Sequence, residues 1–250
     1  MMRTLLMMIF WALTLPLGAL LLFPWVLITG DVRPLYRFGM WGARSGVRLA
    51  GVRVQPIGHE QLDQGRTYIF MSNHISNIDP PLLLPLIPGR TSVMAKQELF
   101  RYPILGTGMR MISLVPVNRE NRDAAIEAVH AAAEVVKQGI HMTVFVEGHR
   151  SRDGKLLPFK KGPFYLAEQC QVAVVPITIQ GTHHVMPKGR FSINSGVVTV
   201  IFHAPIEPDQ FGSRDALMET VRAAIQRGLT DSAIKTTVIG TATDSRESAS

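Results

Sequence analysis

Apolar residues occur along this chain in two kinds of pattern. Short apolar runs predict buried strands at residues 67–71, 112–117, 142–146, 172–179 and 197–202. Apolar positions at steps of three and four predict helices at residues 121–138 and 213–227. Asn121 or Asp123 can cap the first of these helices, and Gly139 can end it. Strands that alternate with helices are typical of an α/β layer fold with a mostly parallel sheet.

The pattern divides the chain into three parts. Residues 56–230 are expected to form a single layered α/β domain, in which helices flank a mostly parallel central sheet. Residues 1–55 form a hydrophobic and basic segment that we expect to be helical and to anchor the chain to a membrane. Residues 231–250 lack a strong pattern and are expected to be a flexible tail. A chain of 250 residues is long enough for one full core.

The N-terminal segment carries no charge between residues 5 and 29. As a helix, this stretch is long enough to cross about 30 Å of hydrocarbon. Pro16 and Pro24 interrupt it, so a kinked, re-entrant or half-buried helix is an alternative to a straight span. A cleaved signal peptide would use Arg3 as its basic start. The apolar stretch is long for that purpose, and no small-residue cleavage site closes it.

Positive charge follows directly after the apolar segment. The net charge is +7, and five arginines lie within a short stretch, at Arg33, Arg37, Arg44, Arg48 and Arg53. If this stretch is helical, the first four fall within about 60° of one another. Such a stripe suits lipid phosphates, although a merely solvated basic face gives the same pattern. If the apolar segment spans a membrane, the same bias favours a cytoplasmic location for the α/β domain. No feature typical of nucleic-acid binding accompanies the charge.

Chemically suggestive residues follow three of the predicted strands, at His74, Arg119 and Glu147. The ends of parallel strands share one edge of a sheet, which is where open α/β sheets bind ligands. His74 and Asp79 cannot meet on a regular helix, but they can meet if the chain turns between them. Asp79 would then hold the Nδ1 proton and leave Nε2 as a base near neutral pH. A capping aspartate beside an incidental histidine is the alternative.

The stretch after residue 146 offers a second candidate site. Gly148 lets the backbone turn, Arg150 presents a planar fork for phosphate, and Glu147 can accept hydrogen bonds from a polyol hydroxyl. A surface Glu–Arg pair of little consequence is the alternative. No Gly-x-Ser-x-Gly elbow is present, and the glycine-to-lysine spacing does not fit a phosphate loop. Residues 106–108 are interpreted as a turn, and His183 and His184 as exposed loop histidines.

Four ordered blocks over about residues 65–180 resemble the glycerolipid acyltransferase family, most closely its bacterial 1-acyl-sn-glycerol-3-phosphate acyltransferases. The blocks are Asn73-His74-x-Ser76-x-x-Asp79, then Lys96-x-Glu98-Leu99 with Val115-Pro116-Val117-x-Arg119, then Phe145-Val146-Glu147-Gly148-His149-Arg150-Ser151, and last Val175-Pro176-Ile177. The resemblance implies that His74 is the catalytic base and Asp79 its partner. It implies substrate-binding roles for Asn73, Ser76, Lys96, Arg119, Glu147, Gly148, Arg150 and Ser151.

The resemblance implies acyl transfer from acyl-CoA or acyl-carrier protein to the free hydroxyl of a lysophosphatidate at a bacterial inner membrane. It implies a lipid bilayer and a lysophospholipid as partners, and neither a cofactor nor a metal. Two residues depart from the family's third block: Val146 replaces Pro, and His149 replaces Thr. These departures leave another lysolipid, or glycerol 3-phosphate, open as the acceptor. A thioesterase or lysophospholipase, and a non-catalytic binder of anionic lipid, are the alternatives from other classes.

Overall fold

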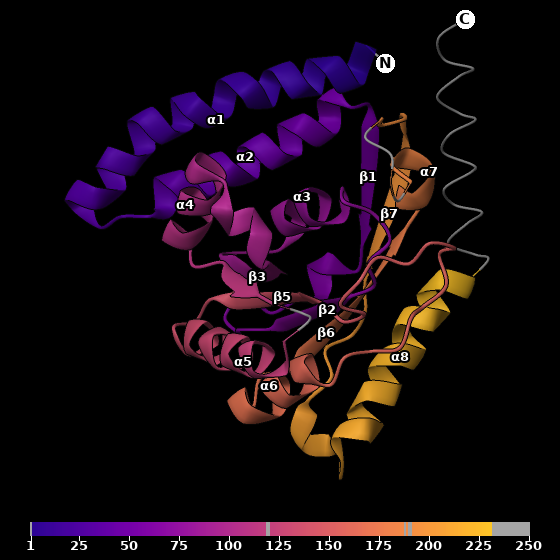
Figure 1. The fold of residues 1–250 in the computed structure, drawn as a ribbon. Coiled ribbons are helices and arrows are strands. Elements are labelled where there is room, and N and C mark those ends of the chain that lie inside the picture. The colour runs from indigo at the N-terminus through magenta and orange to yellow at the C-terminus, as the bar shows by residue number, and fades with distance from the viewer. Residues whose placement is uncertain (1, 119–120, 188, 190–191, 232–250) are drawn as a thin grey trace, which may run out of the picture.

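The central sheet of this computed structural model lies between two layers of helices (Figure 1). The structure describes residues 2–118, 121–187, 189 and 192–231. Seven strands of this described chain form one sheet in the order β1-β7-β6-β2-β5-β3-β4. The strands are β1 (Val52–Ile57), β2 (Ile69–Ser72), β3 (Thr91–Lys96), β4 (Val115–Val117), β5 (His141–Phe145), β6 (Val174–Gln180) and β7 (Gly196–Phe202). All neighbouring pairs are parallel except β6 and β7, which confirms the predicted mostly parallel α/β fold.

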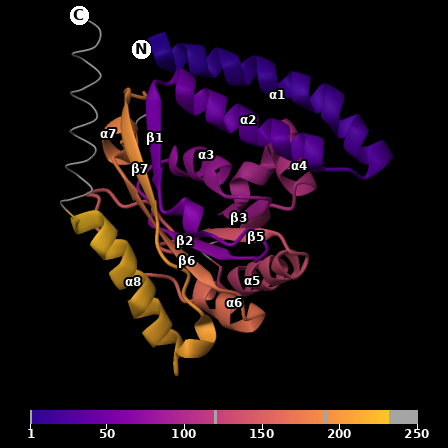
Figure 2. The same cartoon turned by 180° about the vertical axis from the view of Figure 1, so that it is seen from behind.

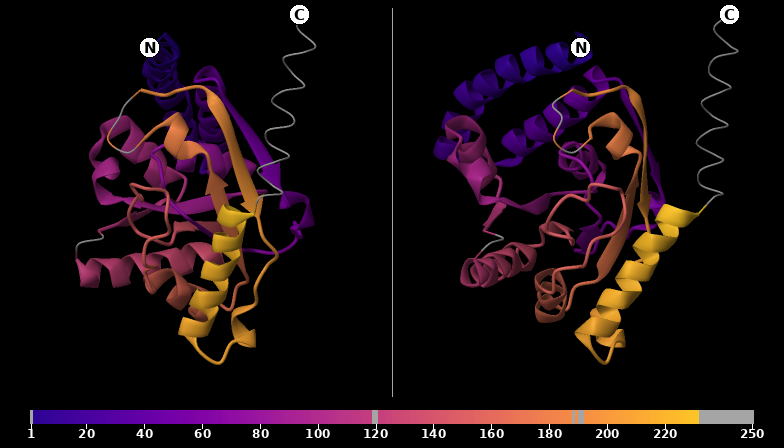
Figure 3. Two further views of the ribbon diagram at one scale, coloured as in Figure 1. Left: turned by 90° about the vertical axis from the view of Figure 1, so that its right-hand side faces the viewer. Right: turned by 45° about the vertical axis from the view of Figure 1, so that its right-hand side comes forward.

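Two hydrophobic clusters cover the two faces of this sheet, because successive side chains of a strand point to opposite faces. Phe70 of β2 belongs to the cluster under the N-terminal helices, whereas Ile69 and Met71 belong to the other cluster. Figure 3 shows the N-terminal helices and α5 on opposite sides of the sheet. The helices of the N-terminal side are α1 (Met2–Thr29), α2 (Arg33–Leu49), α3 (Asp79–Leu83) and α4 (Pro103–Met111). The remaining helices are α5 (Arg122–Lys137), α6 (Gly162–Cys170), α7 (Thr182–Val185) and α8 (Arg214–Thr230).

Most predicted elements lie where the hydrophobic pattern places them. The structure confirms both predicted helices and the strands near residues 69, 142, 174 and 197. Asn121 caps α5, accepting a hydrogen bond from the backbone N–H of Ala124 at 3.0 Å. The run at 112–117 contributes only the short strand β4, because its first residues form the left-handed exit of α4 at Ser113. The predicted turn at residues 106–108 is wrong, since these residues lie within α4.

The N-terminal segment is integrated with the α/β domain. Its helix α1 is continuous through Pro16 and Pro24 and lies lengthwise along α2 (Figures 1 and 2). Val47 and Ala50 belong to one of the two hydrophobic clusters that cover the sheet. The first strand of the sheet, β1, begins at Val52, which is four residues before the expected domain boundary at residue 56. The expected tail at residues 231–250 lies outside the described residues except for residue 231.

Glycines in α2 permit this close packing of α1. A Cβ atom on Gly46 would lie 2.8 Å from Nε1 of Trp11, and one on Gly42 would lie 3.2 Å from the same indole ring. The two glycines, which lower helix propensity, therefore create a smooth surface for a tryptophan of the neighbouring helix. The four arginines of the predicted stripe are all exposed.

Candidate active site

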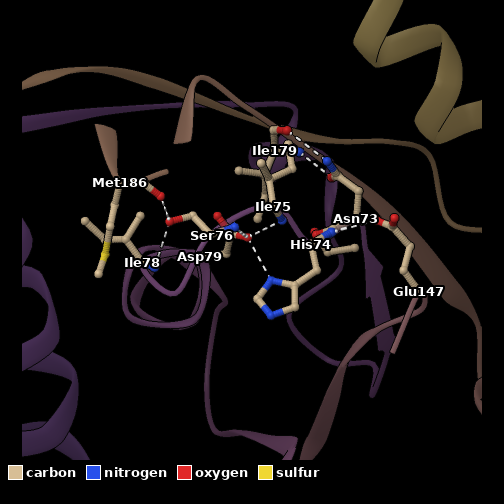
Figure 4. A network of polar contacts seen from close by, with 10 residues as sticks. Asn73, His74, Ile75, Ser76, Ile78, Asp79, Glu147, Ile179 and Met186 are labelled. Carbon is tan, nitrogen blue, oxygen red and sulfur yellow. Dashed lines mark hydrogen bonds and ion pairs between the residues drawn. The ribbon is translucent and has the colours of Figure 1, made fainter. Parts of the chain in front are cut away.

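A tight loop after β2 brings His74 and Asp79 together (Figure 4). Nδ1 of His74 lies 2.8 Å from Oδ2 of Asp79. The same carboxylate oxygen accepts hydrogen bonds from the backbone N–H groups of Ile75 and Ser76, both at 2.7 Å. The chain thus wraps around one carboxylate oxygen before α3 begins at Asp79. This turn supplies the geometry that a regular helix denies to residues five positions apart.

The contact with Asp79 fixes the protonation pattern of the His74 ring. An ionised carboxylate can only accept hydrogen bonds, so Nδ1 carries the proton and Nε2 presents a lone pair. The ring also stacks on Phe145, with a centroid distance of 4.3 Å and an interplanar angle of 29°. Among the described residues, the hydrogen bond of the ring is made by Nδ1, and Figure 4 shows no contact drawn to Nε2. A neutral imidazole held in this way is suited to act as a general base.

The third block clamps the backbone of His74 from both sides. Oε1 of Glu147 accepts the backbone N–H of His74 at 2.8 Å, and the N–H of Ser151 donates to the His74 carbonyl at 2.8 Å. Oε2 of Glu147 accepts the N–H of Leu157 at 2.7 Å. Glu147 is buried, and burial raises the pKa of its carboxyl group, while these two amide hydrogen bonds oppose the rise. Both carboxylate oxygens of Glu147 therefore already accept backbone N–H groups, and its contact with a polyol hydroxyl stays a prediction.

Three further residues expected to bind substrate are also buried and hydrogen-bonded, Asn73 and Ser76 to the backbone and Ser151 to a carboxylate. The side-chain amide of Asn73 accepts the N–H of Ile179 at 2.7 Å and donates to its carbonyl at 3.0 Å. Asn73 thereby extends the pairing of β2 with β6 by one step. Ser76 donates its hydroxyl proton to the Met186 carbonyl at 2.7 Å, and the Ser151 hydroxyl donates to Asp153 at 3.1 Å. These contacts position the local backbone, and the predicted contacts of the three residues with substrate stay predictions.

A cationic cavity lies beside the His74 loop. Its volume is about 500 Å³, and its lining includes Ile75, Arg150, Ser151, Arg152 and His183. Gly148 has a φ of +71°, and a Cβ atom there would lie 3.1 Å from Cγ of Lys160. Glycine therefore permits the turn that carries Arg150 to the cavity. The lining thus includes two arginines, and the guanidinium group is well suited to bind phosphate.

Arg152 and His183 were not among the predicted site residues. His183 and His184 are exposed as predicted, but they lie in the short helix α7 and not in a loop. His183 also lines the cavity. Burial and the neighbouring His184 lower the pKa of His183. The position of β6 could have indicated this residue, because β6 runs parallel to β2 and leads to the same sheet edge. Among the described residues, no group of three or more His, Cys, Asp or Glu side chains is placed to hold a metal ion.

The second block lies further along the same edge. Lys96 ends β3 and is exposed, with its Nζ 3.3 Å from Oε1 of Glu98. Arg119 lies outside the described residues, so its predicted role stays a prediction. Its neighbour Asn118 lines a second cavity of about 450 Å³, together with Gln97 and Arg110. This cavity therefore adjoins both segments of the second block.

The site is that of an α/β enzyme with a histidine base, a carboxylate partner and a cationic cavity at one sheet edge. A family model described as Acyltransferase matches residues 51–180. The chain therefore belongs to the Acyltransferase family, and it is an O-acyltransferase.

Known proteins from several sources are similar to this chain. It is 33% identical over 192 residues to a 1-acyl-sn-glycerol-3-phosphate acyltransferase of Limnanthes douglasii, covering 76% of this chain and 67% of that protein. It is 30% identical over 177 residues to the human 1-acyl-sn-glycerol-3-phosphate acyltransferase alpha, covering 70% of this chain and 62% of the human protein. The crystal structure of the 1-acyl-sn-glycerophosphate (LPA) acyltransferase PlsC from Thermotoga maritima matches with a TM-score of 0.75 and 29% identity, covering 91% of this chain and 95% of that one.

Proposed function

We propose that the protein transfers an acyl chain from a thioester donor to the free hydroxyl of 1-acylglycerol 3-phosphate, giving phosphatidic acid. The observation that carries this proposal is the His74–Asp79 pair, in which Nδ1 meets the carboxylate and Nε2 remains as the base, at the same sheet edge as the cavity of Arg150 and Arg152. The names of the relatives support the choice of acceptor. Acyl-CoA and acyl-carrier protein both present the required thioester.

In the proposed mechanism, Nε2 of His74 removes the proton of the acceptor hydroxyl as its oxygen attacks the thioester carbonyl. The imidazolium that forms is stabilised by Asp79. Collapse of the tetrahedral intermediate breaks the C–S bond, and the imidazolium returns its proton to the departing sulfur. An ester and a free thiol result, and His74 is again neutral. Arg150 and Arg152 hold the acceptor phosphate, and Arg119 is proposed to assist them.

The N-terminal helix is proposed to hold the enzyme at one leaflet of a membrane. With 28 residues, α1 is about 42 Å long, so its length alone permits a full crossing. One end is tied to the domain, since the Thr4 hydroxyl accepts the N–H of Ile193 at 3.2 Å. At the other end, the Phe23 ring lies beside Gly108 of α4. A perpendicular crossing would draw the arginines of α2 into hydrocarbon, at a cost of about 3 kcal/mol for each. This cost favours an orientation of α1 along the membrane surface, and we propose the cytoplasmic face of a bacterial inner membrane as that surface.

A substrate panel tests the proposed function. The purified full chain is incubated with labelled acyl-CoA or acyl-carrier protein and with lysophosphatidate, other lysolipids or glycerol 3-phosphate, and the products are identified by mass spectrometry. We expect phosphatidic acid to form only when lysophosphatidate is present. Thioester hydrolysis that does not depend on an acceptor would instead indicate a thioesterase. Product from another acceptor alone would overturn the proposed substrate.

Replacing Arg150 by alanine is expected to raise the KM for lysophosphatidate by about 10- to 100-fold, since hydrogen bonds to a charged group contribute about 1.5–3 kcal/mol. The KM for the acyl donor should change little. Arg150→Lys should recover only part of the loss, because a lysine cannot bind phosphate in a bidentate manner. Arg122→Ala, at the exposed start of α5, is the matched control. An unchanged acceptor KM in Arg150→Ala would remove this residue from the phosphate site.

Replacing Glu147 by glutamine tests the clamp on His74. Both carboxylate oxygens accept backbone N–H groups, so the glutamine NH₂ group must face one of two donors, at His74 or Leu157. We expect the free energy of unfolding to fall by about 1–3 kcal/mol. We expect kcat to fall by about 10- to 100-fold, because the base is displaced from the acceptor. Glu219→Gln, at an exposed position of α8, serves as the control. A large rise in acceptor KM at unchanged kcat would instead favour contact between Glu147 and glycerol.

A further inference from the structure

The turn before α4 and the first turn of α4 together expose four large apolar side chains. Leu99, Tyr102, Ile104 and Leu105 are all more than a third exposed, and Tyr102 reaches 61%. We call these four residues the α4 patch. Pro103, the first residue of α4, is exposed between them. A folded domain seldom presents consecutive apolar residues to water, so the patch indicates a surface that meets an apolar partner.

The α4 patch adjoins the helix that we place at the membrane. The Phe23 ring of α1 lies 3.6 Å from the position that a Cβ atom on Gly108 would occupy. Figures 1 and 2 both show α4 beside the C-terminal half of α1. The exposed apolar surface of α1, from Leu5 to Ile28, therefore continues onto a second element of the fold.

The chemistry of the patch matches the boundary between lipid headgroups and acyl chains. Arg101, in the turn before α4, and Arg110, in α4, are both exposed. They can contact anionic headgroups. Tyrosine is enriched at this boundary, because it combines an apolar ring with a polar hydroxyl. Exposed apolar residues occur elsewhere, such as Ile126 on α5 and Tyr165 on α6, but these stand alone on the opposite face of the sheet.

The position of the patch relative to the active site gives it a specific role. The α4 patch follows the carboxyl end of β3. The strands β3, β5 and β2 are neighbours and run parallel, so their carboxyl ends lie at the same edge of the sheet. The patch and His74 therefore share one edge of the sheet. A single helix along a leaflet leaves the domain free to rotate about the helix axis. A second contact away from that axis removes this rotation.

We propose that the α4 patch inserts into the lipid headgroup region as a second membrane contact. Together with α1, it turns the His74 edge of the sheet toward the bilayer, where a lysolipid acceptor enters. This inference rests on the proposed function for the purpose of the contact, but the contact itself can be measured without turnover.

The single cysteine of the chain permits a direct test of contact. In a Cys170→Ser background, Tyr102→Cys and Tyr165→Cys each receive an environment-sensitive nitrobenzoxadiazole label. The labelled proteins are mixed with vesicles of phosphatidylethanolamine and a minority of phosphatidylglycerol. We expect the label at residue 102 to brighten severalfold, to shift to the blue and to be quenched by nitroxide-bearing lipid. Tyr165 is 42% exposed. The fluorescence of the label at this position should stay that of a probe in water. A label at residue 102 that behaves like the one at 165 would overturn the proposal.

A kinetic test addresses the purpose of the contact. Tyr102→Asp should lower turnover of lysophosphatidate embedded in vesicles by about tenfold or more, since a charge at the interface opposes insertion. Turnover of a short-chain lysophosphatidate in solution should stay at the wild-type level, which also shows that the variant is folded. Ile126→Asp is the matched control and should not alter either activity. Equal losses with both substrates, or no loss with either, would contradict the orienting role. Failure of wild-type enzyme with both substrates would instead contradict the proposed function, while the label experiment still stands.

Discussion

His74→Ala is expected to lower the rate of acyl transfer by about 10²- to 10⁴-fold, the usual contribution of a positioned general base. The acceptor hydroxyl is a weak nucleophile, and Nε2 of His74 is the group that the structure leaves available to take its proton. The fold should survive, because the contacts with Glu147 and Ser151 are made by the backbone of residue 74 and not by its ring. Steady-state assays with lysophosphatidate and an acyl thioester, beside thermal melting and vesicle sedimentation, measure these effects.

The control for His74→Ala is His130→Ala, which removes an exposed imidazole from α5. Its activity should equal that of the wild type. A His74→Ala protein that turns over like the wild type would remove the base from the mechanism. A protein that has lost both activity and vesicle binding would indicate unfolding. In that case His74→Gln, which keeps a polar side chain of similar length, repeats the test.

The parts of the fold that the sequence predicts best are those where the hydrophobic period is strong. The runs that became β2, β5, β6 and β7 are long apolar stretches, and α5 and α8 have clear helical periods. The strands β1 and β3 were missed because their compositions resemble those of loops. β1 contains Pro56 at the edge of the sheet. β3 buries Thr91, whose hydroxyl lies 2.9 Å from that of Thr143 on β5 and also donates to the His141 carbonyl at 3.3 Å. Such pairing depends on a neighbour fifty-two positions away.

In the candidate site, too, the sequence predicts some features and not others. Residue types and spacing were enough to predict that His74 meets Asp79, because only a turn between them was required. They did not show that Asn73, Ser76 and Glu147 face the backbone, since a polar side chain beside a catalytic residue looks the same in sequence whether it contacts substrate or supports the loop. The distinction depends on burial, and all three are buried. The first and third blocks therefore form one structural unit, in which Glu147 holds the main chain of His74.

Asp79 has a structural role in the loop and an electrostatic role beside His74, and substitutions can separate the two. Its Oδ2 atom accepts two backbone N–H groups and also meets the ring of His74. Its Oδ1 atom is buried and has no hydrogen-bond partner in the described part of the chain. In Asp79→Asn, the carbonyl oxygen should therefore take the place of Oδ2, because only an acceptor satisfies the two backbone donors. The NH₂ group then takes the place of Oδ1. The loop and the His74 tautomer are kept, and only the negative charge is lost.

For Asp79→Asn, we expect kcat to fall by about 10²-fold or more, since an imidazolium beside a neutral amide loses its counter-charge. The free energy of unfolding should fall by only about 1–2 kcal/mol, the cost of one buried NH₂ group without a partner. Asp79→Ala should lose at least as much activity and, in addition, about 1–3 kcal/mol for each of the two stranded amides of Ile75 and Ser76. Chemical unfolding in detergent and steady-state kinetics measure both quantities. If Asp79→Asn kept nearly full kcat while Asp79→Ala unfolded, the carboxylate would serve the loop alone, and its charge would have no part in the transfer step.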